Sequence, residues 1–212
     1  MEKVCIIIGA GQWFGHRLRP SSEDYVIAAD GGYARAVEQN LRIDCVVGDF
    51  DSLGFVPEHT NLVRHPVMKD DSDMLLAVKI GLEKGYRTFL IYGGTGGRTD
   101  HTLANCQVLL YIASQGGRGC LIGNGETMTV IKNGEMRFAP RDTGTLSVFA
   151  FGGIAHGVTL EGLLYPLQNA DLFPDTPLGL SNEFTGKPAR VSVNDGALLL
   201  LWSGAFDKNG LC

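Results

Sequence analysis

Aspartates recur in short polar motifs along the first half of this sequence. Asp30 lies in the motif ADGG, Asp49 and Asp51 lie in GDFDS, and Asp70 and Asp73 lie in KDDSD. In an extended backbone, carboxylates at positions i and i+2 point to the same side, roughly 6.5 to 7 Å apart, so they can share a hard cation directly or through water. Because no histidine or cysteine accompanies the paired carboxylates, Mg²⁺ or Mn²⁺ fits them better than zinc does.

A glycine-rich segment, GGTGGRTDH at residues 93–101, has the composition of a phosphate-binding loop. Glycines let the backbone approach an anion closely, and a helix that starts directly afterwards offers free N–H groups and the positive end of its dipole. An arginine at this place adds a bidentate grip on phosphate. It is not a Walker loop, because no Lys-Ser/Thr pair follows the last glycine. The residues expected to contact phosphate are Gly94, Thr95, Gly96, Gly97 and Arg98.

Short apolar runs alternate with segments of helical period from residue 1 to 123, which predicts a parallel sheet with helices on its faces. The expected strands are Val4 to Ile8, Tyr25 to Ala29, Asp44 to Val47, Thr88 to Tyr92 and Cys120 to Ile122, and the expected helices are Tyr33 to Gln39, Met74 to Lys84 and Thr102 to Ser114. The side chains before the last two helices, Ser72 or Asp73 and Thr99 or Asp100, are the expected helix caps.

ADGG, GDFDS and the glycine-rich loop follow the carboxyl ends of these strands, and in an open α/β sheet that edge is the ligand crevice. KDDSD opens the next helix and should fall near the same edge. Two like charges about 4 Å apart repel by roughly 4 kcal/mol at an effective dielectric near 20. We therefore expect a cationic species among the carboxylates.

From about Glu126 the apolar pattern changes to a period of two, with turn signals between the runs, which predicts a small antiparallel sandwich or barrel. The glycines at 123 and 125 mark the change. We expect an α/β domain at residues 1–123 and a β domain at residues 124–212.

Composition narrows the choice of partners and location. The 212-residue chain carries a formal charge of −5 and has no long basic run, which argues against nucleic acid. No apolar run is long enough for a membrane span or a signal peptide. The five cysteines are odd in number, lack CxxC spacing and lie mostly in apolar runs, as thiols in the cytoplasm do.

Four other readings compete with a phosphate-transfer enzyme. Residues Gly9 to Gly15 after the first strand, with Asp30 about 20 residues on, resemble a dinucleotide fingerprint, but the following segment leaves little room for the helix that must hold the pyrophosphate. The GDFDS motif also suits an aspartyl phosphatase or a metal-dependent sugar transferase, although neither explains the glycine-rich loop. A non-enzymatic nucleotide sensor would keep the loop but gain nothing from the carboxylates.

Together, these motifs resemble one family closely, the bacterial thiamine pyrophosphokinases. ADGG, GDFDS, KDxSD and GGxGGRxDH with Asn105 match its N-terminal motifs in order. GVTLEGLLYPL at 157–167 and GLSNE at 179–183 are similar to its thiamine-side motifs. The small departures are Ser72 where the family usually has threonine, which keeps the hydroxyl, and Asp71 at a variable position.

The resemblance implies an α/β ATP-binding domain, a C-terminal antiparallel β-sandwich, and a homodimer with thiamine bound between subunits. It also implies transfer of pyrophosphate from ATP to the thiamine hydroxyl, with release of AMP. Such an enzyme positions and neutralises charge more than it forms bonds.

The resemblance assigns roles on both substrate sides. Asp49, Asp51 and Asp73 would hold Mg²⁺ on the phosphates, with Asp70 as an outer ligand and Asp30 on the ATP side. The catalytic residues that the resemblance implies are Asp73, Arg98 and Asp100. Arg98 and the amides of residues 94–97 would stabilise charge in the transition state. Asp100 would orient or deprotonate the hydroxyl, or else fix Arg98.

On the thiamine side, the resemblance implies that Tyr165 would stack on a thiamine ring. Ser181 and Asn182 would form hydrogen bonds near the pyrimidine. From the sequence alone, a tyrosine before a proline is more often simple packing.

Overall fold

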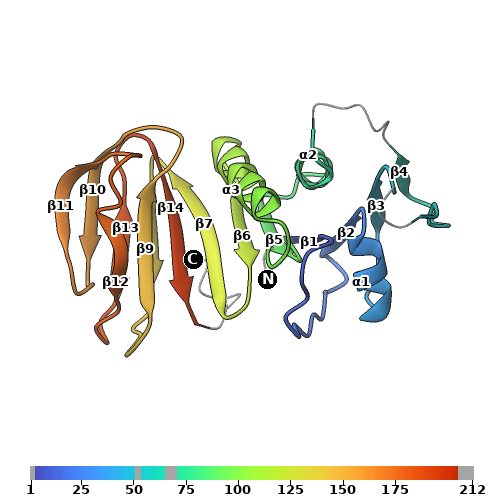
Figure 1. Cartoon of the computed structure of the whole chain (residues 1–212), viewed down its shortest axis with the longest axis horizontal. Helices are drawn as coiled ribbons and strands as arrows, with labels where there is room; N and C mark the ends of the chain where they lie inside the picture. The colour runs from blue at the N-terminus through green and yellow to red at the C-terminus, as the bar shows by residue number, and fades with distance from the viewer. Residues whose placement is uncertain (1–2, 51–53, 65–70, 205–212) are drawn as a thin grey trace.

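The computed structural model describes residues 3–50, 54–64 and 71–204, and within these ranges it contains two β-sheets and three α-helices (Figure 1). The larger sheet has ten strands in the order β12-β9-β14-β7-β6-β5-β1-β2-β3-β4, and the smaller has four in the order β11-β10-β13-β8. Figure 1 shows β11 and β12 toward one end of the long axis of the molecule and β4 toward the other.

Six strands form the parallel half of the large sheet: β1 (Cys5–Ile8), β2 (Tyr25–Ala29), β3 (Cys45–Gly48), β4 (Leu62–Arg64), β5 (Thr88–Tyr92) and β6 (Arg118–Ile122). The expected parallel sheet is confirmed, and β2 and β5 have the predicted bounds. These strands form because apolar runs buried on both faces suit a sheet covered by other layers. The short edge strand β4 was not predicted.

The antiparallel strands come from the second half of the chain. The large sheet continues through β7 (Glu126–Lys132), β9 (Thr145–Ala150), β12 (Gly179–Glu183) and β14 (Ala197–Ser203). The small sheet contains β8 (Glu135–Phe138), β10 (Ala155–Glu161), β11 (Leu167–Leu172) and β13 (Ala189–Ser192). The two stack as the expected antiparallel sandwich; β11 and β12 were not predicted.

Alternation along the strands divides the core into two layers. Leu198, Leu200 and Trp202 of β14 face the small sheet and share its core. Leu199 and Leu201 of the same strand pack on the opposite layer. That layer holds the helices α2 (Asp73–Glu83) and α3 (Thr99–Ser114). The helix α1 (Gly32–Glu38) packs on β1 and β2, on the same side of the large sheet as the small sheet. The predicted α/β half with helices on both faces is thus confirmed.

The helix ends show where the sequence signals held. Ser72 caps α2 as predicted, since its hydroxyl accepts a hydrogen bond from Leu75 N at 3.2 Å. The predicted cap of α3 was wrong: Thr99 and Asp100 lie inside the helix, and Arg98 occupies the cap position. Arginine has no acceptor atom, so the backbone N–H groups of the first turn lack the usual side-chain cap at that position.

The sheet does not break between the two halves of the chain. β6 and β7 pair in antiparallel register, with Cys120 opposite Thr129 and Ile122 opposite Thr127. The two-domain division at residues 123–125 therefore stays a prediction. Among the described residues, no helix is both long and apolar enough to span a membrane.

Candidate active site

The strand order of the large sheet reverses at β1 and β5, which are neighbours in that sheet. Strands β2 to β4 extend the sheet on one side of this pair and β6 extends it on the other. At such a switch point the loops after the two strands separate and leave a crevice at their carboxyl ends. The structure has a cavity of ≈ 690 Å³ there, lined by Gly9, Ala10, Gly11, Ala29, Asp30, Ser72, Asp73, Met74, Gly93, Gly94, Thr95, Gly97, Arg98, Asp100, His101, Thr102, Ala104 and Asn105.

Most of the residues predicted for the phosphate side meet in this cavity. Its walls contain Asp30, Asp73, Gly94, Thr95, Gly97, Arg98 and Asp100. Gly96 lies in the same loop without lining the cavity, and Asp49 does not line it either. Asp51 and Asp70 lie outside the described residues. Three separate segments of the sequence thus converge on one crevice.

The backbone around Asp30 is held in an unusual conformation. Asp30 has φ +46°, and its N–H donates to the Val47 carbonyl at 2.7 Å. A methyl group at Gly32 would lie 1.9 Å from the Ile8 carbonyl oxygen, so only glycine lets α1 begin this close to β1. The ADGG motif therefore turns the chain sharply at the end of β2 and leaves Asp30 in the cavity wall.

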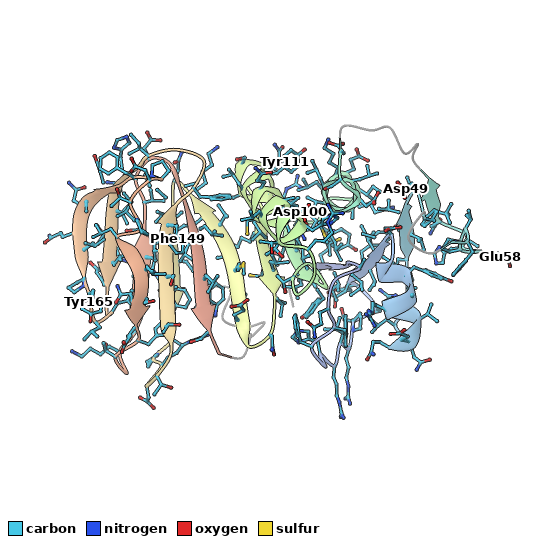
Figure 2. All side chains as sticks on the ribbon, in the orientation of Figure 1. Asp49, Glu58, Asp100, Tyr111, Phe149 and Tyr165 are labelled. Atoms are coloured by element: carbon cyan, nitrogen blue, oxygen red, sulfur yellow. The ribbon has the colours of Figure 1, made fainter. Side chains whose placement is uncertain are left out.

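Asp49 and Asp73 belong to two elements that follow this turn in the chain. Asp49 directly follows β3, and Figure 2 shows it at the end of that strand. Asp73 is the first residue of α2 and lines the cavity. In the described residues, no group of three histidine, cysteine, aspartate or glutamate side chains is close enough to hold a metal ion. The donors present are carboxylate oxygens, which suit a hard cation such as Mg²⁺.

The glycine-rich loop is fixed from the helix behind it. The side-chain amide of Asn105, which is buried on α3, donates to the Gly94 carbonyl at 2.8 Å. A side chain at Gly94 would collide with Leu121 Cδ1 at 2.4 Å. Thr95 is only 6% exposed. The loop is therefore a close-packed turn whose backbone faces the cavity.

Arg98 and Asp100 form a bidentate ion pair at the start of α3. Arg98 Nε donates to Asp100 Oδ1 at 3.1 Å, and a second nitrogen donates to Oδ2 at 2.5 Å. Asp100 Oδ1 also accepts from the His101 N–H at 3.0 Å. Both side chains are mostly exposed, so the pair contributes little to stability. The ion pair instead holds the Arg98 guanidinium beside the phosphate loop.

The hydrogen bond from Arg98 lowers the pKa of Asp100 below its ordinary value, with a smaller contribution from the His101 N–H. A general base works best when its pKa is near the working pH, so a carboxylate with a depressed pKa is a weak proton acceptor. Of the two roles left open for Asp100, this geometry favours fixing Arg98.

The residues predicted for thiamine form a second cluster. The buried side chain of Asn182 holds the backbone of Tyr165 from both sides, because Oδ1 accepts from Tyr165 N at 2.9 Å and Nδ2 donates to Tyr165 O at 2.7 Å. The Tyr165 ring is exposed, at 62%. Ser181, also exposed, has φ +54° and donates its N–H to Ser147 Oγ at 3.1 Å. Asn182 thus positions Tyr165.

The two clusters lie far apart within one chain. Five inter-strand steps separate β5, which leads into the phosphate loop, from β12, which carries Ser181 and Asn182. At about 4.8 Å a step, the separation is about 24 Å. Figure 2 agrees, since Tyr165 lies near one end of the molecule and Asp100 near its middle.

The structure also adds residues that the sequence analysis had set aside. Gly9, Ala10 and Gly11 belong to the rejected dinucleotide fingerprint, yet they line the cavity. The reason for rejection holds, because residues 9–24 contain no helix. The available signal was the position of these glycines directly after a strand at the switch point.

Family models match both halves of the chain. Residues 17–121 match the thiamin pyrophosphokinase catalytic domain, and residues 134–198 match the thiamin pyrophosphokinase vitamin B1 binding domain. The chain belongs to the thiamin pyrophosphokinase family. The fold and the enzyme class expected from the sequence motifs are confirmed, since this family consists of thiamine diphosphokinases.

Known members of the thiamin pyrophosphokinase family align with this chain over most of their length. Thiamine pyrophosphokinase of Bacillus subtilis (strain 168) is 29% identical over 184 residues, covering 84% of this chain and 86% of the relative. A crystal structure of thiamine pyrophosphokinase from Bacillus subtilis is 25% identical with a TM-score of 0.81, covering 96% of this chain and 100% of the other. A thiamin pyrophosphokinase family protein from Enterococcus faecalis is 28% identical with a TM-score of 0.80, covering 97% and 100%.

Proposed function

We propose that this chain transfers a pyrophosphoryl group from ATP to the hydroxyl of thiamine and releases thiamine diphosphate and AMP. The observation that carries the proposal is the cavity at the switch point, where a glycine-rich loop, a helix start and Arg98 meet carboxylates. It occurs in a chain that matches both the catalytic and the vitamin B1 binding domains of one family.

The phosphate loop supplies most of the positive potential in this proposal. Backbone N–H groups of residues 94–97 and of the start of α3 bind phosphate oxygens, because N–H groups at a helix start have no intrahelical acceptor. The His101 N–H is the exception, since it donates to Asp100 Oδ1. Arg98 adds two parallel hydrogen bonds. Fixed donors of this kind stabilise the charge that spreads over the transferred group in the transition state.

In this proposal, carboxylates on the phosphate side of the site would hold Mg²⁺. We propose Asp49, Asp51 and Asp73 as ligands, with Asp70 further out and Asp30 beside the nucleotide. A divalent cation held there would supply positive charge that neutralises the phosphate oxygens. Asp73 also faces the cavity from the first turn of α2.

Asp100 acts in the proposal by orienting Arg98. When phosphate enters, the guanidinium has to divide its donors between Asp100 and the new anion, so Asp100 sets its direction. The acceptor hydroxyl attacks the β-phosphorus, the bond from the β-phosphorus to the α–β bridging oxygen breaks, AMP leaves, and the hydroxyl proton goes to solvent.

Thiamine binding is assigned to the second cluster. Tyr165 presents an exposed ring for stacking, Ser181 an exposed hydroxyl, and Asn182 keeps the Tyr165 backbone in place. Reacting atoms must come within about 3 to 3.5 Å, while the two clusters of one chain are about 24 Å apart. The active site therefore needs two copies of the chain, the cavity of one facing the Tyr165 cluster of the other.

The surface around the Tyr165 cluster supports a homodimer. Leu164, Leu178 and Leu180 are 47%, 61% and 56% exposed, and β12 is an edge strand of the large sheet. Exposed leucines close in sequence to an open sheet edge are typical of a protein interface.

Residues 1–123 would then serve ATP and Mg²⁺, and residues 124–212 thiamine and the dimer contact. We also propose a cytoplasmic location, because Cys5, Cys45, Cys106 and Cys120 are buried free thiols.

The reaction is tested by incubating the protein with ATP, Mg²⁺ and thiamine and identifying the products. AMP together with thiamine diphosphate supports the proposal, and EDTA should abolish both until Mg²⁺ is added in excess. ADP would indicate an ordinary kinase, phosphate alone a phosphatase, and no turnover a nucleotide sensor.

The shared site is tested by mixing two variants, Arg98→Ala and Tyr165→Ala, each assayed at low thiamine where it is nearly inactive alone. If the site spans two chains, a mixed dimer contains one intact site and activity returns. If each chain held a complete site, every site in the mixture would be defective and no activity would return.

A further inference from the structure

The segment that follows β1, residues 9–16, lies directly against the glycine-rich loop; we name it the N-terminal strap. Three backbone hydrogen bonds join the two segments. Gly9 N donates to Tyr92 O at 2.8 Å, Gly11 N to Gly93 O at 2.7 Å and Gln12 N to Thr95 O at 3.0 Å. The strap therefore runs beside the start of the phosphate loop like an additional short strand.

Glycine is required where the two segments touch. A methyl group at Gly11 would lie 2.5 Å from the Thr95 carbonyl oxygen and 2.6 Å from that of Gly93. At Gly9 it would lie 2.6 Å from the Gly93 carbonyl oxygen. These neighbours are backbone atoms, which cannot rotate away as a side chain can. Any side chain at Gly11 thus pushes the phosphate loop.

The far end of the strap is anchored by aromatic packing. The rings of Trp13 and His16 lie 6.1 Å and 5.2 Å from the ring of Tyr92, which is the last residue of β5. A methyl group at Gly96 would lie 2.6 Å from Phe14 Cζ, so the Phe14 ring lies against the tip of the loop. Contacts at Tyr92, Gly93, Thr95 and Gly96 therefore fix the first part of the loop.

We propose that the N-terminal strap positions the phosphate loop, with Gly11 and Phe14 as positioning residues that set the affinity for the triphosphate. The inference rests on the proposed function, since it assigns ATP to the same cavity. It gives a role to a motif that precedes residue 17, where the match to the catalytic family model begins.

The first test is Gly11→Ala, measured by steady-state kinetics with each substrate varied in turn. The Thr95 carbonyl would have to move from 2.5 Å to at least 3.0 Å from the new methyl group. A displacement of about 1 Å at a reacting centre costs on the order of 100-fold in rate, so we expect kcat/KM for ATP to fall by roughly 10- to 100-fold. The KM for thiamine should stay unchanged. Gly153→Ala is the matched control, because its methyl group would meet no atom within 4 Å.

The second test avoids a steric clash. Phe14→Ala removes the ring behind Gly96, and we expect weaker binding of a non-hydrolysable ATP analogue with Mg²⁺ by calorimetry, while Phe14→Leu, which keeps apolar contact, should restore most of it.

Hydrogen exchange gives a third readout on Gly11→Ala. The backbone amides of residues 11 and 12 should exchange faster in this variant, because their acceptors have moved.

The outcomes separate the two proposals. If the wild-type chain forms no thiamine diphosphate, the proposed function is wrong. If the wild type is active and folded Gly11→Ala keeps its kcat/KM for ATP, the strap does not position the loop. A variant in which the KM values for ATP and thiamine rise together would also overturn the inference, since that pattern indicates general loosening.

Discussion

Asn105 offers the sharpest test of the phosphate loop, because one buried hydrogen bond joins it to Gly94. Asn105→Ala removes the donor and leaves the Gly94 carbonyl without its partner at 2.8 Å. Leaving a buried acceptor unsatisfied costs about 1–3 kcal/mol. Alanine recovers up to about 0.7 kcal/mol of helix propensity. With that recovery subtracted in full, the net loss in the free energy of unfolding should be about 0.3–2.3 kcal/mol.

For a chain of this size, that loss lowers Tm by about 1–9 °C, which calorimetry or circular dichroism measures. The matched control is Gln107→Ala, an exposed position on the same helix, where Tm should stay or rise slightly. Asn105→Asp should be worse than alanine, because it replaces the donor with an acceptor that faces a carbonyl oxygen.

The same variant reports on function. With the Gly94 carbonyl released, the loop amides lose their fixed direction, so KM for ATP should rise while KM for thiamine does not. If Asn105→Ala matched Gln107→Ala in both Tm and KM for ATP, the reasoning about this loop would be refuted.

Three further outcomes are expected. Asp100→Asn and Arg98→Lys should each lower kcat/KM for ATP, and the double variant should lose less than the product of the two effects, because Asp100 acts through Arg98; multiplicative losses in the double-mutant cycle would contradict this. Tyr165→Ala should raise KM for thiamine by roughly 5- to 150-fold, the equivalent of about 1–3 kcal/mol of ring stacking, and leave KM for ATP unchanged; equal changes in both would exclude a thiamine-specific role. Burial lowers the pKa of His16 below its ordinary 6.5, so its contribution to stability is present above about pH 6.5 and is lost as the pH falls through the lower folded pKa. The Tm measured between pH 5 and 8 should therefore depend less steeply on pH in His16→Gln than in the wild type. An unchanged slope would show that His16 does not cause this pH dependence.

The sequence predicted the elements that carry strong local signals. β2 and β5 are continuous apolar runs, and their bounds agree with the prediction. The turn glycines Gly85 and Gly116 have φ +82° and +72°, as helix-ending glycines should. Local pattern was enough here because burial on both faces leaves few alternatives.

The missed elements are edge strands with weak patterns. β11 reads LQNADL, with half of its positions exposed, and β12 reads GLSNE, with three of its five positions exposed. Their pairing partners, rather than their own composition, make them strands. The early start of α3 at Thr99 was missed for a related reason, because an arginine at the cap position gives no local signal.

At the candidate site, spacing predicted which loops would meet but not how they would be held. The cavity brings Asp30, Asp73 and Asp100 together as the strand-end argument required. The hydrogen bond from Asn105 and the contact between Gly11 and Thr95 join residues distant in the sequence, so only the packed structure reveals them. Asp51 and Asp70 lie outside the described residues, and their part in a metal site stays a prediction.

The antiparallel pairing of β6 with β7 limits how this enzyme can be dissected. A fragment that stopped near Gly123 would have an open β6 edge and would uncover the side of α3 that now packs on Met128 and Val130. Such an edge recruits other strands, so the fragment should aggregate on expression. The intact polypeptide should instead melt in a single cooperative transition, and the halves should fail to reassemble when produced separately.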